Sequence, residues 1–169
     1  TFLFSEKAII ALTMTFVIIA RQIDLSVASI IAVSSCVLGY TTSLGYDTWL
    51  VISLTLLSGA ICGAFNGAII TKFAIPSIIV TIGTMSLFRG LAYSFLEDSY
   101  YNKFPKLVSN LGGGYLFGYI PYAFLTFIIL AIIFAFILHK TSVGKKIYSI
   151  GNNPDAAQYT GIAVDKYTF

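Results

Sequence analysis

Hydrophobic residues occur in long, nearly uncharged runs along this chain, separated by short polar or charged segments. A helix needs about 20 residues to cross the hydrocarbon core of a bilayer, and most of the runs are near that length. The pattern predicts an all-α, polytopic transmembrane bundle with about five apolar segments. They are drawn at residues 6–20, 25–44, 48–71, 76–95 and 120–138.

The first run is short and is followed at once by the cluster Arg21-Gln22-Ile23-Asp24. We expect a helix break over residues 21–26, with Asp24 or Ser26 capping the helix that follows. Two depths fit this pattern. The break is either a short cytoplasmic turn or lies deeper in the membrane, where irregular backbone must be buried in protein or line a cavity.

The third run contains Gly59, Gly63 and Gly67, spaced every fourth residue. Small residues on one face of a membrane helix let a neighbouring backbone approach closely, so we expect these glycines to serve helix packing. Asn66 lies beside them as a polar amide at membrane depth. It is expected to hydrogen-bond across helices or to face a polar path.

The fourth run begins at Ile75-Pro76, because the residue before proline disfavours the helical region. Ser77, Thr81 and Thr84 then follow at spacings of four and three, which places their hydroxyls on one helical face. Such hydroxyls either bond their own backbone and serve packing, or line a solute path. We expect the stripe, with Asn66, to face the bundle interior. Arg89 is expected to snorkel toward the outer interface.

A short polar helix is predicted from Asn153, well apart from the apolar runs. Asn153 suits the N-cap, Pro154 the first helical position and Asp155 the positive end of the helix dipole, and Gly161 suits the stop. About two turns are too few for an independent helix, so this helix must dock. It is either a loop helix resting on its own protein or a coupling helix presented to another subunit, where the small residues Ala156 and Ala157 would let a groove close around it.

Composition and charge agree with a membrane protein. Of 169 residues 57% are hydrophobic and 10% are charged, whereas a soluble domain is about one quarter charged. If the segment 139–166 is cytoplasmic, six basic residues fall inside and three outside, the bias expected of cytoplasmic loops. The loop 96–119 is then external, and its Gly112-Gly113-Gly114 run is a turn or flexible loop.

Enzyme chemistry finds no support in the sequence. Cys36 and Cys62 each lie inside an apolar run, which favours packing over a metal site or disulfide. His139 is a lone histidine, and Gly144-Lys145 lacks the flanking residues of a nucleotide-binding loop. We therefore expect no catalytic residue, no metal and no cofactor in this chain, so that any ATP is hydrolysed by a partner subunit.

Several sequence blocks carry a family resemblance: Ile23-Asp24-Leu25-Ser26-Val27, Gly63-Ala64-Phe65-Asn66-Gly67, Ile75 to Thr84, Arg89-Gly90, Thr141-Ser142-Val143-Gly144, and Gly151 to Ala157 with Gly161-Ile162. In this order they resemble the membrane permease subunits of bacterial ABC sugar importers of the ribose, xylose, galactose, rhamnose and autoinducer-2 type. Permeases of that family are roughly twice as long, so the chain is interpreted as an internal fragment.

The resemblance implies a multi-pass protein of the bacterial inner membrane that forms part of a sugar pathway. Its implied partners are two cytoplasmic ABC ATPases, a second permease copy or homologue, and a periplasmic or extracellular sugar-binding protein; membrane lipid surrounds it, and no nucleic acid is involved. The pathway is expected near Asp24, Ser26, Asn66, Ser77, Thr81 and Thr84, and ATPase coupling at Asn153, Pro154, Asp155, Ala156, Ala157 and Gly161.

Two departures and one alternative accompany this resemblance. The family usually has a glycine pair where this chain has Arg21-Gln22, and a glycine where it has Ala28, which reduces flexibility at the break. The alternative function is an ion-coupled secondary transporter of a small polar solute. Such a mechanism places ionisable residues at mid-membrane, and here only Arg89 and Asp24 come near it. A membrane enzyme or a purely structural subunit finds no supporting residues.

Overall fold

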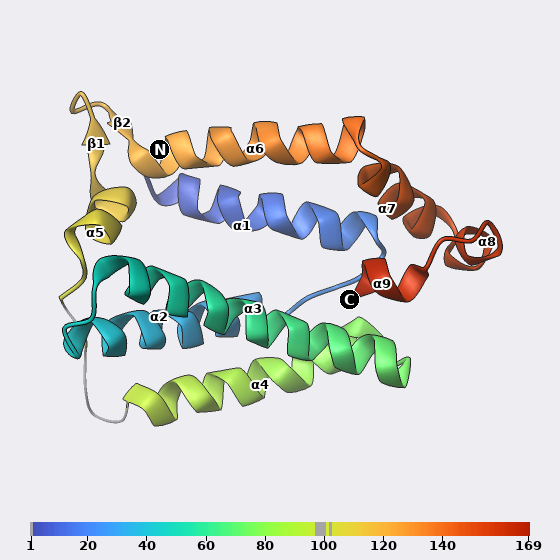
Figure 1. The fold of residues 1–169 in the computed structure, drawn as a ribbon, viewed down its shortest axis with the longest axis horizontal. Coiled ribbons are helices and arrows are strands. Elements are labelled where there is room, and N and C mark those ends of the chain that lie inside the picture. The colour runs from blue at the N-terminus through green and yellow to red at the C-terminus, as the bar shows by residue number, and fades with distance from the viewer. Residues whose placement is uncertain (1, 97–100, 102) are drawn as a thin grey trace. The chain divides into compact units, whose positions relative to one another are not determined.

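The computed structural model describes residues 2–96, 101 and 103–169, and most of these residues are helical. Figure 1 shows the order of the elements along the chain. The helices are α1 (Phe2–Ile19), α2 (Val27–Ser43), α3 (Thr48–Phe73), α4 (Ser77–Leu96), α5 (Lys106–Gly113), α6 (Tyr122–Lys140), α7 (Ser142–Asn152), α8 (Pro154–Tyr159) and α9 (Val164–Thr168), and the strands are β1 (Tyr115–Leu116) and β2 (Ile120–Pro121).

The chain divides into two compact units. One contains the residues up to Gln22 together with Val108–Thr168, and the other contains Ile23–Leu107 with Phe169. The boundary between Gln22 and Ile23 falls inside the expected helix break. Unit 1 is therefore built from two separate stretches of sequence, whereas nearly all of unit 2 is one continuous stretch.

Unit 2 is a three-helix arrangement in which α2 packs against both α3 and α4. Its core consists of small and medium side chains from all three helices, with Phe88 as the one large aromatic. The buried members are Val33, Cys36, Cys62, Phe88 and Ala92. Both cysteines are buried and unpaired, in agreement with the packing role expected for them.

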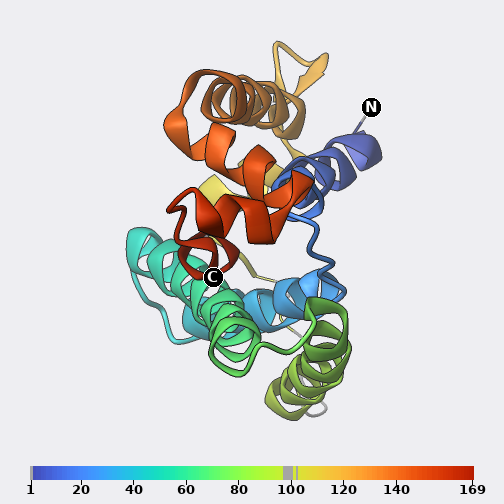
Figure 2. The same cartoon turned by 90° about the vertical axis from the view of Figure 1, so that its right-hand side faces the viewer.

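Unit 1 is organised around α1 and α6, which lie side by side in both ribbon views (Figures 1 and 2). Phe16 and Phe134 meet edge to face between them, with ring centroids 4.9 Å apart. The helix α7 follows α6 at once and packs against both α6 and α1. Its N-terminus is capped by Thr141, whose hydroxyl accepts a bond from the N–H of Gly144.

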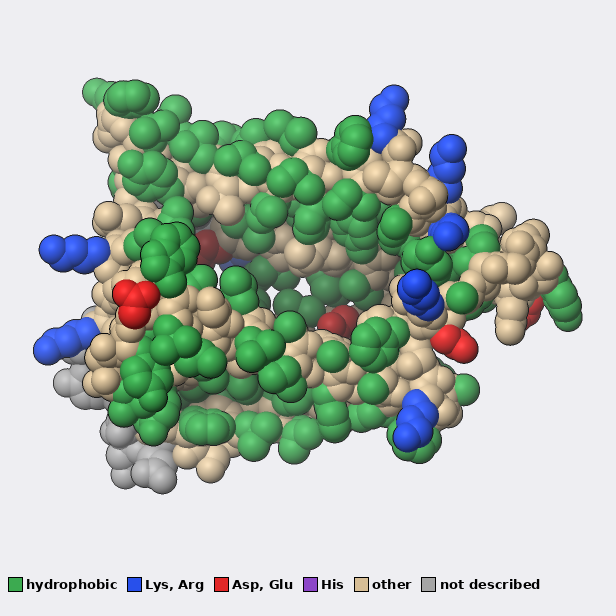
Figure 3. Space-filling view, in the orientation of Figure 1, with side chains coloured by type: hydrophobic (Ala, Val, Ile, Leu, Met, Phe, Trp, Pro, Cys, Tyr) green, Lys and Arg blue, Asp and Glu red, His purple; other side chains and the backbone are tan. Residues whose placement is uncertain are grey.

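Each of the five apolar runs contains one long helix, which confirms the helical fold class. Among the described residues, α3, α4 and α6 are long and apolar enough to cross a membrane, and α2 is apolar but only 17 residues long. Hydrophobic side chains cover the flanks of the helices, and Lys and Arg side chains lie near helix ends (Figure 3). This surface suits a lipid environment or further protein.

The loop expected over residues 96–119 contains regular structure. Residues Lys106–Gly113 form α5, so Gly112 and Gly113 close a helix instead of forming a flexible turn. Gly114 then ends the helix, with its N–H bonded to the carbonyl of Asn110, and leads into the short antiparallel pair of β1 and β2. The triple glycine terminates one element and starts another.

The glycines of α3 have different neighbours among the described residues. A Cβ atom at Gly59 would lie 3.2 Å from Ser34 Oγ of α2, but one at Gly63 would meet nothing within 4 Å. Gly67 is buried beside the backbone of Phe169, the residue after α9. Close approach of a neighbour is therefore present at Gly59 and Gly67, and the packing role of Gly63 stays a prediction.

Candidate functional site

A non-helical segment separates α1 from α2, as the sequence predicted for residues 21–26. Arg21 has a left-handed φ of 59°. Its N–H bonds the carbonyl of Ile18, and the N–H of Gln22 bonds that of Val17. These two bonds make a Schellman ending, which satisfies the last carbonyls of α1. The break is thus an ordered structure with its own hydrogen bonds.

Two hydroxyls of α4 hold the backbone of this segment. Ser77 Oγ accepts a bond from the Ile23 N–H at 3.0 Å, and Thr81 Oγ1 donates to the Ile23 carbonyl at 3.2 Å. Both backbone groups of one unwound residue are therefore satisfied by side chains of a neighbouring helix. Such satisfaction is what irregular backbone at membrane depth requires.

The third member of the hydroxyl stripe behaves differently. Thr84 Oγ1 reaches only the carbonyl of Thr81 in its own helix, at 3.5 Å. All three stripe residues are buried, so the stripe faces the protein as expected. Ser77 and Thr81 support the break, whereas Thr84 makes a local bond.

Asn66, Ser26 and Asp24 form a chain of hydrogen bonds beside this segment. Asn66 Nδ2 donates to Ser26 Oγ at 2.8 Å, and Ser26 Oγ donates to Asp24 Oδ1 at 2.6 Å. Each bond in such a chain polarises the next, which strengthens the whole in a low-dielectric interior. The bond across helices expected of Asn66 is confirmed, since it joins α3 to the residue that precedes α2.

The capping expected of Asp24 and Ser26 takes another form. Ser26 occupies the N-cap position of α2, but its side chain makes no cap bond to the helix. Its hydroxyl is engaged with Asp24, whose Oδ1 also accepts the Ser26 N–H at 2.8 Å. The prediction of a side-chain cap on the first turn is wrong, because the carboxylate closes a turn just before the helix instead.

The structure thus gathers five of the six predicted polar residues around one unwound segment within unit 2. Asp24, Ser26 and Asn66 form the hydrogen-bond chain, and Ser77 and Thr81 hold Ile23. Asn66 Oδ1 remains a buried atom with no hydrogen-bond partner among the described residues. The cluster can fix a backbone and bind polar atoms. No group of three or more His, Cys, Asp or Glu side chains forms a metal site in the part of the chain that the structure describes.

The predicted polar helix is present as α8, and its caps are as expected. Asn153 Oδ1 accepts the Ala156 N–H at 3.1 Å, Pro154 occupies the first helical position, and Asp155 lies in the first turn. Gly161 has a φ of 84°, and its N–H bonds the carbonyl of Gln158. Both ends of this helix were therefore predicted correctly.

The two small residues of α8 do not share one environment. Ala156 is exposed, but Ala157 is only 1% exposed, and α8 packs against α7 and α9 of its own unit. The expectation that Ala157 contacts a partner's groove is wrong for the described chain, because this methyl group already faces the interior. The outer face instead presents Asp155, Ala156 and Gln158 with Tyr159, which is 92% exposed.

Helix α7 is one of the elements that the sequence interpretation missed, with α5, α9 and the strands β1 and β2. Its inner face carries the buried residues Gly144, Ile147 and Ile150, spaced by three, which is an amphipathic signal that could have found it. A Cβ atom at Gly151 would collide with the carbonyl oxygen of Ile19 at the end of α1. The helix that carries α8 is therefore seated directly on the end of α1.

A second polar feature of unit 2 is a cavity of about 380 Å³ between α2 and α4. Arg89 and Tyr93 of α4 and Ser29 of α2 line it. Ser29 and Tyr93 were not singled out in the sequence, because an isolated hydroxyl in an apolar run gives no periodic signal. Arg89 was expected to snorkel, and its side chain borders this cavity.

Known proteins place the chain in a family. The whole sequence, residues 1–169, matches the family described as the permease component of the branched-chain amino acid transport system. The chain belongs to this permease family. No solved structure gives a significant match.

Curated relatives of the chain are import permeases. It is 36% identical over 169 residues to the ribose import permease protein RbsC of Haemophilus influenzae, which covers 96% of this chain and 51% of the relative. It is 32% identical over 157 residues to the autoinducer 2 import system permease protein LsrC of Escherichia coli, a match that covers 93% of this chain and 46% of the relative. It is 34% identical over 171 residues to the autoinducer 2 import system permease protein LsrD of Klebsiella pneumoniae, a match that covers 93% of this chain and 49% of the relative.

The resemblance drawn from the sequence blocks is confirmed by these relatives. The chain spans about half the length of the curated relatives that it matches. It is a membrane permease by family, with helices apolar enough to cross a bilayer among its described residues.

Proposed function

We propose that the chain is part of the transmembrane permease of an ATP-binding-cassette importer that carries a sugar or sugar-like molecule across the bacterial inner membrane. The observation that carries this proposal is the match to import permeases for ribose and autoinducer 2 over more than nine tenths of the chain. Hydroxyl and amide groups buried among apolar helices suit a neutral, polar solute.

The proposed assembly contains a second permease copy or homologue, two cytoplasmic ATPases and a sugar-binding protein outside the membrane. ATP is bound and hydrolysed by the ATPase subunits, and this chain has no enzymatic step of its own. The proposed pathway runs beside Asp24, Ser26, Asn66, Ser77, Thr81 and Thr84, whose hydrogen bonds hold the unwound segment in place.

Helix α8 is the proposed contact with an ATPase. Its caps fix both ends, and its exposed face offers Ala156, Gln158 and the aromatic ring of Tyr159. An amphipathic helix that is buried on one side by its own protein can present the other side to a groove. Because α7 carries α8 and is seated on the end of α1, a movement of α8 would be passed to α1 within unit 1.

Uptake by the full-length permease, reconstituted with its ATPase and binding protein, tests the proposal. Labelled D-ribose, D-xylose, D-galactose, L-rhamnose and autoinducer 2 are offered in turn, with L-leucine as the amino acid comparison. We expect one of the sugars or autoinducer 2 to accumulate in an ATP-dependent manner. A matched preparation with an ATPase variant that binds but does not hydrolyse ATP should accumulate none.

The same vesicles separate this function from an ion-coupled transporter. A protonophore should leave uptake unchanged as long as ATP is present. Uptake that collapses with the ion gradient and persists without ATP hydrolysis would favour the ion-coupled mechanism. Uptake of L-leucine alone would contradict the sugar assignment.

A further inference from the structure

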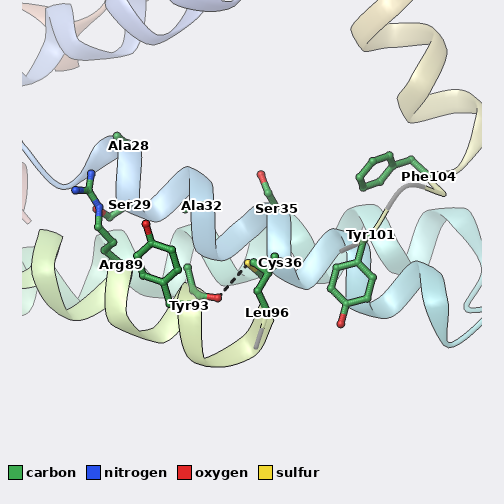
Figure 4. Close-up of a pocket in the computed structure, with 11 residues that line it drawn as sticks. Ala28, Ser29, Ala32, Ser35, Cys36, Arg89, Tyr93, Leu96, Tyr101 and Phe104 are labelled. Atoms are coloured by element: carbon green, nitrogen blue, oxygen red, sulfur yellow. Dashed lines mark hydrogen bonds between the residues drawn. The ribbon is translucent and has the colours of Figure 1, made fainter. Parts of the chain in front are cut away.

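The cavity between α2 and α4 has a polar end and a mainly apolar end (Figure 4). Arg89 and Tyr93 reach from α4 toward the first turns of α2, where Ala28 and Ser29 lie. Toward the other end the lining consists of Ser35, Cys36, Leu96 and the aromatic residues Tyr101 and Phe104. A volume of about 380 Å³ falls at the lower end of the range of small-molecule sites, about 300–1,000 Å³.

Ser29 supplies an unused hydroxyl at the polar end. Its side chain is 1% exposed, and its Oγ has no hydrogen-bond partner among the described residues. A buried polar atom without a partner is unfavourable, so it is expected to find one in the working protein. Ser29 lines this cavity, and a turn of its side chain would bring the buried Oγ to a molecule bound there.

Arg89 supplies a guanidinium with donors to spare. No Asp or Glu is among the residues that line the cavity. An arginine inside a membrane helix is costly unless a partner or water satisfies it. Arg89 lies about 18 Å along α4 from Ser77, since each residue rises about 1.5 Å. It is therefore far from the end of α4 whose Ser77 bonds the helix break.

Tyr93 completes the polar end one turn further along α4. Its ring forms part of the open side of the cavity, since the side chain is 72% exposed, and its hydroxyl points toward α2 in Figure 4. A tyrosine offers an apolar face together with a hydroxyl that both donates and accepts. Ala32 on the facing helix α2 and Ala92 beside Tyr93 on α4 are small and leave room between the helices.

Tyr101 and Phe104 line the far end of the cavity. Tyr101 lies close against α2, because a Cβ atom placed on Gly39 would come within 2.6 Å of the Tyr101 ring. Gly39 therefore provides the space in which the aromatic ring rests.

We propose that this cavity is a binding site for the transported polyhydroxylated solute, with Arg89, Tyr93 and Ser29 bonding its hydroxyl groups. The inference rests on the proposed function and assigns the solute contacts to the α2–α4 cavity. A sugar has hydroxyls that donate and accept and C–H faces that pack on aromatic and apolar walls, and this lining offers both. The polar cluster at the helix break is then a support, and the solute contacts lie about one turn further along α2 and about two to four turns further along α4.

Transport kinetics of the full-length importer give the first test, with whichever sugar of the uptake panel the unmodified protein accumulates. Arg89→Gln shortens the side chain and removes its charge, and Tyr93→Phe keeps the ring but removes the hydroxyl. We expect KM to rise about tenfold for Arg89→Gln and several-fold for Tyr93→Phe, because each loses a hydrogen bond to the solute. Tyr119→Phe, at an 88% exposed tyrosine outside the cavity, is the matched control and should not change KM.

Protection from a thiol reagent gives a second test that needs no transport cycle. In a background with Cys36→Ala and Cys62→Ala, a cysteine is placed at Ser35, which is exposed and lines the cavity. We expect the sugar to slow its reaction with a water-soluble methanethiosulfonate by at least threefold. A cysteine at Ser43, exposed on the same helix but outside the lining, is the control and should react at one rate with or without sugar.

The outcomes separate this proposal from the proposed function. An unmodified importer that takes up none of the sugars refutes the function. An importer that transports a sugar but shows neither a KM change in the Arg89 and Tyr93 variants nor protection at Ser35 refutes the cavity site alone. Equal protection at Ser35 and Ser43 would also count against it, because a general conformational change would then explain the slowing. Protection at Ser35 alone supports the site even if Arg89→Gln fails to reach the membrane.

Discussion

At the scale of single residues, four of the described helices end in a left-handed residue, and two of these residues carry a side chain. Residues 21, 45, 74 and 161 have φ of 59°, 75°, 51° and 84°. Two of these positions are glycines, and the other two are Arg21 and Ala74. A left-handed conformation costs a residue with a side chain about 1–3 kcal/mol, and glycine nothing.

Replacing Arg21 by glycine should therefore stabilise the permease by about 1 kcal/mol. The measurement is thermal unfolding of the full-length protein in detergent. Arg21→Ala is the matched control, since it removes the charged side chain but retains a Cβ atom, and it should give little gain. Equal melting temperatures for the glycine and alanine variants would show that the charge, and not the backbone conformation, is responsible.

The family resemblance gives this residue a further meaning. The resemblance implies a glycine pair here, and this chain has Arg21-Gln22 with an intact Schellman ending. The break thus has its hydrogen bonds although Arg21 holds a left-handed conformation. Reduced flexibility at this position stays a prediction.

At the scale of elements, the hydroxyl stripe of α4 separates into residues with different tasks. Thr81 donates to the Ile23 carbonyl in the break, whereas Thr84 bonds only its own helix. We expect Thr81→Val, which keeps the shape, to lower sugar uptake several-fold and to destabilise the protein by about 1 kcal/mol. Thr84→Val should change both quantities little, and uptake per amount of membrane-inserted permease is the measurement.

A comparable loss in both valine variants would contradict this division of tasks. It would mean that the two hydroxyls line the solute path directly, the role that the sequence stripe left open. Replacement of Thr81 by Leu adds volume at a side chain that is 1% exposed and should be more harmful than Thr81→Val.

Helix α8 offers a similar contrast within two adjacent alanines. Ala157 is buried against its own unit and Ala156 is exposed. We expect Ala157→Leu to lower the melting temperature of the isolated permease, because the added atoms have no room. Ala156→Leu should leave that temperature unchanged but lower ATP-driven uptake by tenfold or more, because it obstructs the proposed ATPase groove.

Cross-linking from a cysteine at Gln158, which is exposed on α8, checks the partner directly. A cross-link to the ATPase is the expected result. Labelling of the same cysteine by a reagent confined to the periplasmic side would contradict both the cytoplasmic placement and the coupling role. Normal transport by the Ala156→Leu variant would contradict the contact between α8 and the ATPase groove. It would not contradict the cytoplasmic placement of α8.

The helices could be predicted because their sequence signals are local. The contacts of the site could not, because each joins two residues that are far apart in the sequence. The apolar runs and the caps Asn153 and Gly161 specify their helices within a few residues. The hydrogen bond between Ser77 and Ile23 joins residues 54 positions apart. It depends on tertiary packing, so no periodic pattern in the sequence predicts it. Helix α7 was overlooked because only three buried residues mark its inner face, and the segment around them is polar.

The length of α2 bears on the depth of the break. Its 17 residues rise about 25 Å, less than the roughly 30 Å of a bilayer core. With its outer end at one interface, the Ser26 end is expected to lie inside the hydrocarbon. The bonds from Ser77 and Thr81 to Ile23 are consistent with this depth, since water is absent there.

At the scale of the whole molecule, the order of sequence and the order of packing differ. Unit 2 is nearly continuous from Ile23 to Leu107, so its helices can pair with neighbours that were made just before them. Unit 1 joins the residues up to Gln22 with Val108–Thr168. The two parts of unit 1 are thus separated by all of unit 2 in sequence, although α1 packs directly on α6.

This discontinuity has a consequence for biosynthesis. About a hundred residues lie between the end of α1 and the α6 surface that it packs against, and at about 5–20 residues per second the ribosome needs roughly 5–20 s to make them. During that interval α1 must wait in the membrane without its partner, held by lipid or by an insertion chaperone. Nascent chains stalled after residue 107 should cross-link from Phe16 to such a factor, and chains stalled well beyond Lys140 should cross-link from Phe16 to Phe134 instead.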